Sequence, residues 1–580
     1  MTHGHMRKCL SILTEPTGME RAGFYFILGI MCVVIWAYPY VLTFDGAAHA
    51  ANARIIVELL TGECPVAARL FQLNPHILPN WTGHAFMAAL IYTGLPASVA
   101  EKILFTLCLL LTATGFRMLV RTAKGNPLLS WPVLTLSLGG FLTGGAYNYM
   151  LGVGLGFIFL ALYIDHRIPP RAARLVGISL LLVLIWLSHI IAFLMCGLFV
   201  MIHELLLWRH AHKIDSGNQS LPASLGLHIR KNSGMILAFL PAMMLTVYYL
   251  SLSFSQVKVD YGDSIGKGLN LLYLVSLYDF VRDYTAPDMW QFTAMLLLGA
   301  VSLFFLGKQI VSRTTTGTIE SAALICAFSL WAMSFFTQSA VNGGWLLDAR
   351  LRTLGWCFAF LTLGLSGTHT RNQFFAYVCI LLAAINIIDF SGSARRTQEI
   401  YRALTKDMPA ITDHSLIYTL NLPGAPATPI WAYGTIPRYL SLDKKCTYDL
   451  SNYEASLDYF PVRYRTNIVA ETLYQLPYFK DRDVNLLAWL KMDNVSRTKF
   501  EERTGLKIDY VFQLGDAGRM LAYTDFASEN IRLYHEKYAA GFYKAIRTDV
   551  LKGFEPIHRF TYRDQAPFTI FKRSGTNYKE

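Results

Sequence analysis

The segment FYFILGIMCVVIWAYPYVLTFDGAAH covers residues 24–49 and decides how the rest of the chain is interpreted. Its first part, residues 24–42, is almost wholly apolar and long enough to cross a bilayer as a helix. A carboxylate and an imidazole, Asp45 and His49, follow directly and stand four residues apart. Residues at that spacing share one face of a helix. Because ionisable groups at the edge of a membrane are costly to place, this pair indicates a functional use.

The composition extends this interpretation to most of the chain. Of 580 residues, 53% are hydrophobic and only 16% are charged, against about 25% charged residues in soluble domains. Apolar stretches of spanning length recur along the sequence and predict about eleven transmembrane helices. They cover residues 24–42, 103–120, 128–143, 147–164, 172–187, 190–208, 234–250, 290–306, 322–336, 354–365 and 374–388.

The character of the sequence changes after Asp389, where charged and turn residues become frequent. About 190 residues are enough to bury a core of their own. We therefore expect a polytopic α-helical membrane protein with a C-terminal α/β domain. Its parts would be a cytoplasmic N-terminus (1–23), a transmembrane domain (24–389) with a first outer loop (43–102), and a soluble extracytoplasmic domain (390–580).

The positive charge of +12 is explained by membrane topology, and nucleic acid is not an expected partner. Lys and Arg collect on the cytoplasmic loops of membrane proteins. Arg7, Lys8 and Arg21 precede the first span, which places the N-terminus inside, and no cleavage site follows that span. Later basic clusters fit the alternation only if the short apolar stretch 85–95 does not cross. An interfacial or re-entrant helix is predicted there.

This topology gathers the polar and ionisable groups at the outer face of the membrane. They are Asp45, His49, His76, His84, Asn148, His189, Asp260, Asp263, Asp279, Asp348, Arg350 and Arg352. Two cysteines, Cys64 and Cys446, also fall on the outer side and are candidates for a disulfide. A transporter would more often spread such groups along a path near the midplane.

Each group in the first outer loop has two interpretations. Asp45 is a candidate general base, because a partly desolvated carboxylate has a raised pKa, but Asp also commonly caps a helix such as the one expected from Ala47. His49 either orients Asp45 or contacts substrate, or simply faces headgroups. His84 is a further candidate for substrate binding. His189 is the polar break in a long apolar run, where a turn lining the site or a buried imidazole would fit.

Two later segments supply further candidates. Arg350 and Arg352 open the tenth span, and arginine holds phosphate oxygens through its planar fork; alternatively, Arg352 pairs with Asp348 at the surface. The long loop 251–288 is suited to a lid, in which Asp260 and Tyr261 would bind sugar hydroxyls. A divalent metal on Asp260 and Asp263 is the weaker alternative. No cofactor is otherwise expected.

Two patterns have simpler structural explanations beside the functional ones. Gly152, Gly154 and Gly156 lie within a span and indicate close helix packing rather than a nucleotide loop. The segment 452–465 is rich in Tyr and Arg, which can stack on sugars and hold anions, but packing of this segment onto the membrane domain is the favoured interpretation. No phosphate-binding G-x-x-x-x-G-K-[ST] and no zinc-binding H-E-x-x-H motif is present.

The segment Asp45-Gly-Ala-Ala-His49, the interfacial loop and the many later spans resemble the GT-C superfamily of membrane glycosyltransferases. This superfamily includes protein O-mannosyltransferases and the bacterial lipid A aminoarabinose transferase. The resemblance covers residues 20–390 in layout, and it implies a polyprenyl-phosphate sugar donor and an acidic residue after the first span. No Asp-x-Asp or Glu-x-Asp pair occurs around residues 144–148, so a metal-dependent oligosaccharyltransferase is not expected.

The resemblance therefore predicts a bacterial inner-membrane glycosyltransferase whose site faces the periplasm. Direct attack on the anomeric carbon would make it an inverting enzyme. Asp45 would be the base and Arg350 or Arg352 the phosphate clamp, with His49, His84, His189, Asp260 and Tyr261 binding substrate. The acceptor would be a glycan, lipid or protein. A transporter or flippase of lipid-linked saccharides is the alternative, and a membrane assembly protein that recruits partners is a third.

Overall fold

The computed structural model describes residues 16–41, 43–165, 172–215, 221–252, 267–277, 289–312, 317–337, 340–341, 344–366, 369–406, 410–421, 438–452, 454–456, 460–465, 497–514, 551–560 and 568–574. The predicted lid residues Asp260, Tyr261, Asp263 and Asp279 lie outside these ranges.

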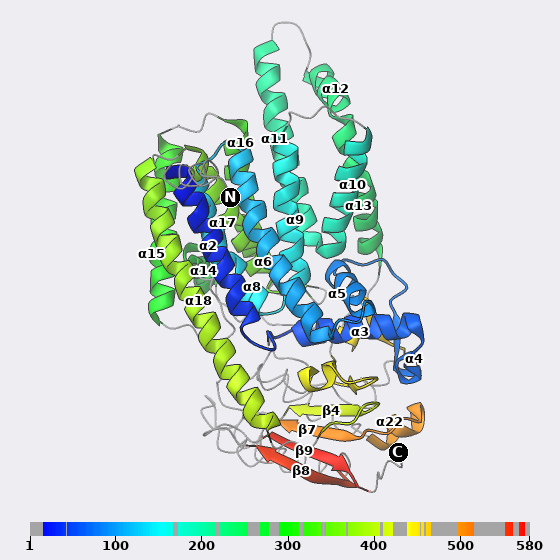
Figure 1. Cartoon of the computed structure of the whole chain (residues 1–580). Helices are drawn as coiled ribbons and strands as arrows, with labels where there is room; N and C mark the ends of the chain where they lie inside the picture. Colours follow the sequence, from blue (N-terminus) through cyan, green and yellow to red (C-terminus); the bar gives the residue numbers. More distant parts are fainter. Residues whose placement is uncertain are drawn as a thin grey trace, which may run out of the picture.

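Long helices run side by side and form a bundle (Figure 1). They are α2 (Pro16–Trp36), α6 (Ala97–Thr122), α9 (Tyr147–Ile164), α10 (Ala172–Ser188), α11 (Ile190–Asp215), α13 (Ser233–Ser251), α15 (Met289–Val311), α16 (Thr318–Phe336), α17 (Leu347–Ser366) and α18 (His369–Thr405). Two shorter helices, α12 (Leu221–Lys231) and α14 (Lys267–Val275), accompany them.

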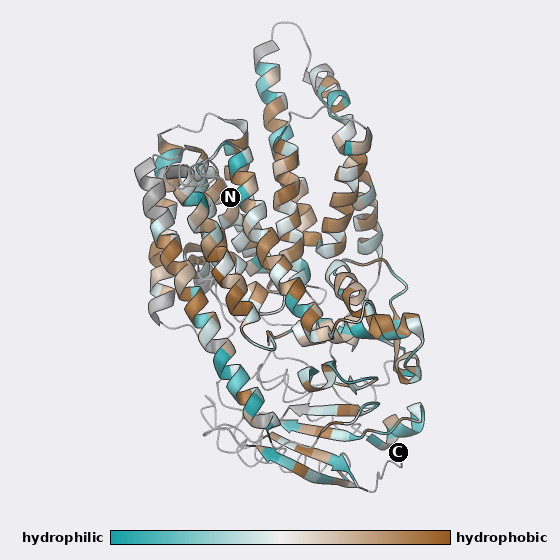
Figure 2. Ribbon diagram, viewed as in Figure 1, coloured by the Kyte–Doolittle hydropathy of each residue, from teal (hydrophilic) through white to brown (hydrophobic). Residues whose placement is uncertain are grey.

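Seven helices in the described part of the chain are long and apolar enough to cross a membrane. These stretches are Gly18–Trp36, Ala97–Thr122, Tyr147–Ile164, Ile190–Lys213, Ser233–Ser251, Phe292–Val311 and Thr318–Phe336. Hydrophobic residues predominate along most of the bundle, whereas hydrophilic residues become more frequent toward its ends (Figure 2). This is the architecture of a helical, multi-pass membrane protein.

Two predicted membrane segments can be compared directly with the structure. Residues 128–143 do not form one helix: the chain there is split into η1 (Pro127–Ser130), α7 (Pro132–Ser137) and α8 (Gly140–Thr143). Prolines begin the first two pieces and the Gly139–Gly140 pair separates the last two, which interrupts a continuous helix. The stretch 85–95 falls largely in α5 (Thr82–Tyr92), whose 11 residues span only about 16 Å, too short to cross a bilayer.

The glycines of α9 allow it to pack closely between two neighbours, as the sequence indicated. A Cβ on Gly154 would lie 2.8 Å from the backbone of Leu111 in α6. A Cβ on Gly152 would lie 3.0 Å from the side chain of Ala192 in α11, and one on Gly156 would lie 2.9 Å from Met195. Small residues at a helix interface let backbones approach closely, so α9 is held firmly at the centre of the bundle.

Helix α3 (Gly46–Thr61) lies across one end of the bundle, between the long helices and the C-terminal part of the chain (Figure 1). It is followed by α4 (Pro65–Leu70) and strand β1 (Phe71–Leu73). Strand β1 pairs antiparallel with β6 (Val462–Tyr464). The Tyr- and Arg-rich segment 452–465 therefore packs onto the first loop, which was one of its two predicted roles.

The C-terminal part contains a five-stranded mixed sheet in the order β5-β4-β7-β9-β8, and α18 leads from the bundle down to it (Figure 1). The strands are β4 (Leu416–Asn421), β5 (Tyr448–Asp449), β7 (Tyr510–Leu514), β8 (Phe554–Phe560) and β9 (Phe568–Arg573), with α22 (Arg497–Thr504) beside them. Strand β4 is parallel to β5 and β7, and β9 is antiparallel to β7 and β8. Ile417, Phe512 and Ile570 are buried in its core.

The C-terminal chain is attached to α3 by a buried arginine. Arg54 donates hydrogen bonds to the backbone carbonyls of Ser441, Leu442 and Lys444 at 2.7–2.9 Å, and to that of Thr447. Glu58, one turn later on α3, lies 3.4 Å from the Arg54 guanidinium and also accepts a 2.7 Å hydrogen bond from Tyr448. A buried guanidinium is stabilised when several carbonyl oxygens accept its hydrogen bonds and a carboxylate lies beside its charge.

A disulfide joins Cys64 to Cys446, with 5.6 Å between their Cα atoms. The pairing predicted from the shared side of these two cysteines is therefore confirmed. The bond closes a separation of 382 residues and ties the first loop to the same segment that Arg54 holds.

This disulfide predicts a covalent link that survives cutting of the chain. We expect a protease site inserted between Asp215 and Leu221 to yield two fragments that migrate together without reductant and apart with it, on gel electrophoresis. In the Cys446→Ser variant the fragments should separate under both conditions. Separate fragments from the unreduced wild-type sequence would contradict the pairing.

Candidate functional site at the junction helix

The start of α3 is packed against a buried polar network. Oε1 of Glu101, on α6, accepts hydrogen bonds from the hydroxyls of Tyr147 (2.6 Å) and Tyr439 (2.8 Å). Thr43 contacts the same oxygen at 3.4 Å and accepts a hydrogen bond from the backbone N–H of Gly46 at 3.0 Å. Glu101 is 1% exposed, and its Oε2 has no hydrogen-bond partner among the described residues.

Gly46 leaves the space that this network occupies. A Cβ at this position would lie 1.8 Å from Oε1 of Glu101 and 2.4 Å from the hydroxyl of Tyr147. Gly145 is equally constrained, because its φ is +91° and a Cβ there would lie 2.8 Å from the backbone N of Asp45. The two glycines bring the start of α3 against the turn that precedes α9.

Asp45 is half-buried and immediately precedes α3. Its backbone N–H donates to the carbonyl of Gly144 at 3.1 Å, and its carbonyl accepts from Ala48 and His49 at 3.0 Å. Its side chain makes no capping hydrogen bond to α3. Of the two predicted roles of Asp45, helix capping is thus not the one that its side chain performs here.

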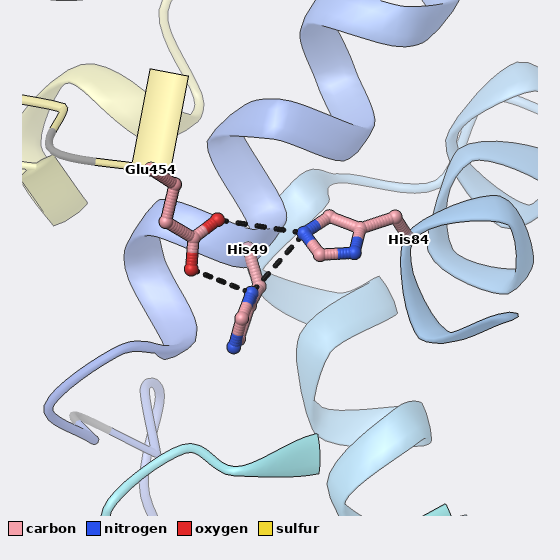
Figure 3. Close-up of side chains that lie close together, drawn as sticks. All are labelled: His49, His84 and Glu454. Atoms are coloured by element: carbon pink, nitrogen blue, oxygen red, sulfur yellow. Dashed lines mark hydrogen bonds and ion pairs between the residues drawn. The ribbon is translucent and has the colours of Figure 1, made fainter. Parts of the chain in front are cut away.

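His49, His84 and Glu454 converge from three segments of the chain (Figure 3). Nδ1 of His49 lies 2.8 Å from Oε1 of Glu454 and 3.1 Å from Nε2 of His84. Nε2 of His84 lies 3.4 Å from Oε2 of Glu454. All three side chains are buried, with exposures of 6%, 0% and 0%. Two imidazoles and a carboxylate are a donor set that binds transition-metal ions.

Without a bound metal ion, the electrostatics of this cluster favour a protonated His49 beside an ionised Glu454. Burial lowers the pKa of His49, but the charge of Glu454, its hydrogen bond and the charge of Asp45 raise the pKa to about 8. Burial raises the pKa of Glu454, but the charge of His49 and hydrogen bonds from both imidazoles lower the pKa to about 2. Burial lowers the pKa of His84, and this effect dominates there. The carboxylate is therefore ionised at neutral pH.

A second group of predicted residues contacts Tyr149, near the start of α9. Arg350, which is half-buried, donates a 2.8 Å hydrogen bond to Nε2 of His189. Its guanidinium carbon lies 5.0 Å from the ring centre of Tyr149, whose hydroxyl donates to the backbone carbonyl of Arg350 at 3.2 Å. Burial and the Arg350 charge hold the pKa of His189 well below its usual value, so this imidazole is neutral.

Arg352 has a different environment from Arg350. It is 2% exposed and forms a 2.8 Å ion pair with Asp348, one turn earlier on α17. An ion pair of Arg352 with Asp348 was the alternative interpretation of the sequence. The structure shows this pair, but it is buried rather than on the surface. Arg352 is therefore held by a buried ion pair within α17.

The structure thus brings together candidates from four predicted outer turns. Asp45 and His49 contact Gly144 and Gly145, and the backbone N–H of Trp81 donates to the carbonyl of Leu187, two residues before His189. His76 is further out, with its Nδ1 2.9 Å from the hydroxyl of Tyr248.

Two buried carboxylates of this site, Glu101 and Glu454, were not predicted. Glu101 carried a signal in the sequence, because it is an isolated acid near the start of an apolar span. Glu454 carried none beyond its place in the aromatic segment 452–465, since nothing in the local sequence relates it to His49.

No protein-family model matches the chain, and no curated protein matches it either. The function must therefore be inferred from the site itself.

The tight packing around Gly46 predicts a destabilised Gly46→Ala variant. The added methyl group must displace Glu101 and Tyr147, and overpacking of this kind costs about 1–3 kcal/mol. We expect a lower midpoint of thermal unfolding in detergent. Gly29→Ala in α2 is the matched control, because a Cβ there meets nothing within 4 Å, and it should leave the midpoint unchanged or slightly raised. Equal midpoints for both variants would contradict the described packing.

Proposed function

We propose that this chain is an integral-membrane glycosyltransferase of the GT-C type, which transfers a sugar from a polyprenyl-phosphate donor to a lipid, glycan or protein acceptor. In a bacterial inner membrane the chain would form about eleven spans. Helix α3 and the C-terminal part, including the α/β sheet, would lie on the periplasmic side. The site is at this outer end of the bundle.

Two observations support this orientation. The Cys64–Cys446 disulfide is at the end of the bundle that carries α3, and disulfides persist in oxidising compartments such as the periplasm. Basic residues such as Arg209, Lys213 and Lys231 occur at the end of α11 and in α12, at the opposite end of the bundle (Figure 1). Positive charge on that side fits a cytoplasmic face.

The observation that carries the proposal is the common attachment of Asp45 and Arg350 to one short stretch, residues 144–149. Asp45 is fixed through Gly144, and Arg350 is fixed through Tyr149. A residue with a half-buried carboxylate and one with a half-buried guanidinium are thus both attached to the chain that forms the start of α9. Its helix dipole favours an anion such as a donor phosphate.

In the proposed reaction, Asp45 accepts the proton of an acceptor hydroxyl. The hydroxyl oxygen attacks the anomeric carbon, and the bond from that carbon to the phosphate oxygen breaks as the new glycosidic bond forms. The electron pair leaves with the polyprenyl phosphate, whose charge Arg350 stabilises. Direct displacement inverts the anomeric configuration. His49 and His84 are turned toward Glu454, so we assign them to positioning α3 rather than to binding sugar.

Because Asp45 is the proposed general base, the Asp45→Asn variant should lose sugar-transfer activity. Membrane vesicles containing the full-length protein would receive a panel of radiolabelled polyprenyl-phosphate hexoses, and label released from the lipid phosphate would be measured. General-base catalysis contributes about 100- to 10,000-fold, so a loss of at least roughly 100-fold is expected.

Glu63→Gln is the control for this experiment, because Glu63 is an exposed acid in the same loop. It should retain the wild-type rate. A wild-type rate for correctly inserted Asp45→Asn would contradict the proposal. Movement of intact lipid-linked sugar across the vesicle, with no glycosidic bond broken, would identify a flippase instead.

The different environments of Arg350 and Arg352 predict opposite defects. Arg350→Gln should raise the KM for the donor by roughly 10-fold or more, because a charge-assisted hydrogen bond to phosphate is lost, with little change in thermal stability. Arg352→Gln should instead lower the unfolding midpoint, since Asp348 is left buried and unpaired at a cost of about 3–5 kcal/mol. Donor titrations and thermal unfolding separate the two, and identical effects would contradict the assignment.

A further inference from the structure

The hydrogen bonds of His84 define which of its nitrogens carries a proton. Nδ1 lies 2.8 Å from the backbone carbonyl oxygen of Asn80. A carbonyl can only accept, so Nδ1 is the N–H of this ring. In a neutral imidazole the other nitrogen, Nε2, is then an unprotonated lone pair. That lone pair is directed at His49 and Glu454.

The same reasoning applies to His49 with the nitrogens exchanged. Its Nε2 lies 3.0 Å from the carbonyl oxygen of Gly145, so Nε2 is the N–H donor. Nδ1 is then the lone pair of the neutral ring, and it lies 3.1 Å from Nε2 of His84. Two backbone carbonyls thus turn both lone pairs toward each other.

The third member of the cluster is also an acceptor. Oε2 of Glu454 is held by a 2.6 Å hydrogen bond from Asn52, whose own side-chain oxygen accepts from Asn452 at 2.7 Å. Oε1 lies 2.8 Å from Nδ1 of His49, yet no described group reaches it with hydrogen-bond geometry. With both rings neutral, three acceptors meet in a buried place and repel each other. The cluster therefore needs a cation, which is either the proton that His49 carries when no metal is bound or a metal ion.

We propose that His49 Nδ1, His84 Nε2 and the Glu454 carboxylate bind a divalent metal ion of the zinc class. Donor atoms about 2.0–2.1 Å from a tetrahedral zinc ion lie about 3.3 Å from one another, and the three separations here are 2.8, 3.1 and 3.4 Å. Donation of the second ring N–H to a backbone carbonyl is the usual support of metal-binding histidines. Two imidazoles with one carboxylate suit zinc better than magnesium or calcium.

The ion would join parts of the chain that are far apart in sequence. His49 belongs to α3, His84 to α5 and Glu454 to η3 (Glu454–Ser456). The metal would hold the C-terminal segment against the first loop, beside the contacts of Arg54. It would also set the position of the α3 N-terminus, four residues before His49, where Asp45 stands. The site does not depend on the proposed sugar transfer.

Metal content and stability of the full-length protein test this site. Protein purified in detergent without added metal, then incubated with Zn²⁺ and desalted, should carry one zinc ion per chain by inductively coupled plasma mass spectrometry. Zinc X-ray absorption should report nitrogen and oxygen neighbours without sulfur, which excludes binding at the cysteines. A strong chelator should lower the unfolding midpoint, and Zn²⁺ should restore it.

Variants of the ligands assign the ion to these residues. Glu454→Gln and His84→Asn should each weaken Zn²⁺ binding by roughly 100-fold or more, beyond what loss of a supporting residue costs. His76→Gln is the matched control, because His76 lies in the same loop but contacts Tyr248 instead. It should keep the stoichiometry and the response to chelator.

The wild-type measurements decide the proposal even if the ligand variants do not fold. A wild-type protein that retains no zinc after incubation, and whose unfolding midpoint changes with neither chelator nor Zn²⁺, would overturn it. That result would identify the cation in the cluster as a proton on His49, paired with the Glu454 carboxylate. Zinc retained with sulfur neighbours would also overturn the assignment.

Discussion

The polar side chains of α3 lie at the end of an apolar helix bundle and require hydrogen-bond partners. The arrangement of the rest of the molecule depends on this requirement. His49, Asn52, Arg54 and Glu58 are all buried on this helix. Buried polar and charged groups are costly unless hydrogen-bonded, and the apolar helices provide few partners. The C-terminal chain supplies them through its carbonyls at 441–447, Tyr448 and Glu454. The first loop and the C-terminal segment are therefore a single interface.

This interface also determines what the site can do. The same helix that holds the C-terminal chain begins with Asp45, so the carboxylate is positioned by contacts made one to three turns away. Gly46 and Gly145 let the helix start reach the turn before α9, and Tyr149 of α9 contacts Arg350. The proposed proton transfer to Asp45 would require a fixed position of this kind.

Much of the fold could be predicted because each apolar span carries its own signal. The predicted limits of α9 coincide with the observed helix Tyr147–Ile164, and α5 is as short as the sequence indicated. The span expected at 128–143 was wrong as one helix, since hydropathy does not register how Pro132 and the Gly139–Gly140 pair divide the chain. Among the site residues, the sequence could not distinguish the role of Arg352 from that of Arg350, because both open the same span. Only the tertiary packing shows that Arg352 is buried with Asp348.

By itself, the sequence determined the membrane character of the chain and the position of Asp45 after the first span, and it placed Cys64 and Cys446 on the same side as candidates for a disulfide. These properties follow from local composition and from the alternation of charge across a membrane. Only the tertiary structure decided that Glu101 and Glu454 meet the start of α3 and that two backbone carbonyls direct the imidazoles of His49 and His84 at Glu454. Such contacts join residues up to 405 positions apart in sequence number, from 49 to 454, and no local pattern encodes which distant groups will share a buried site.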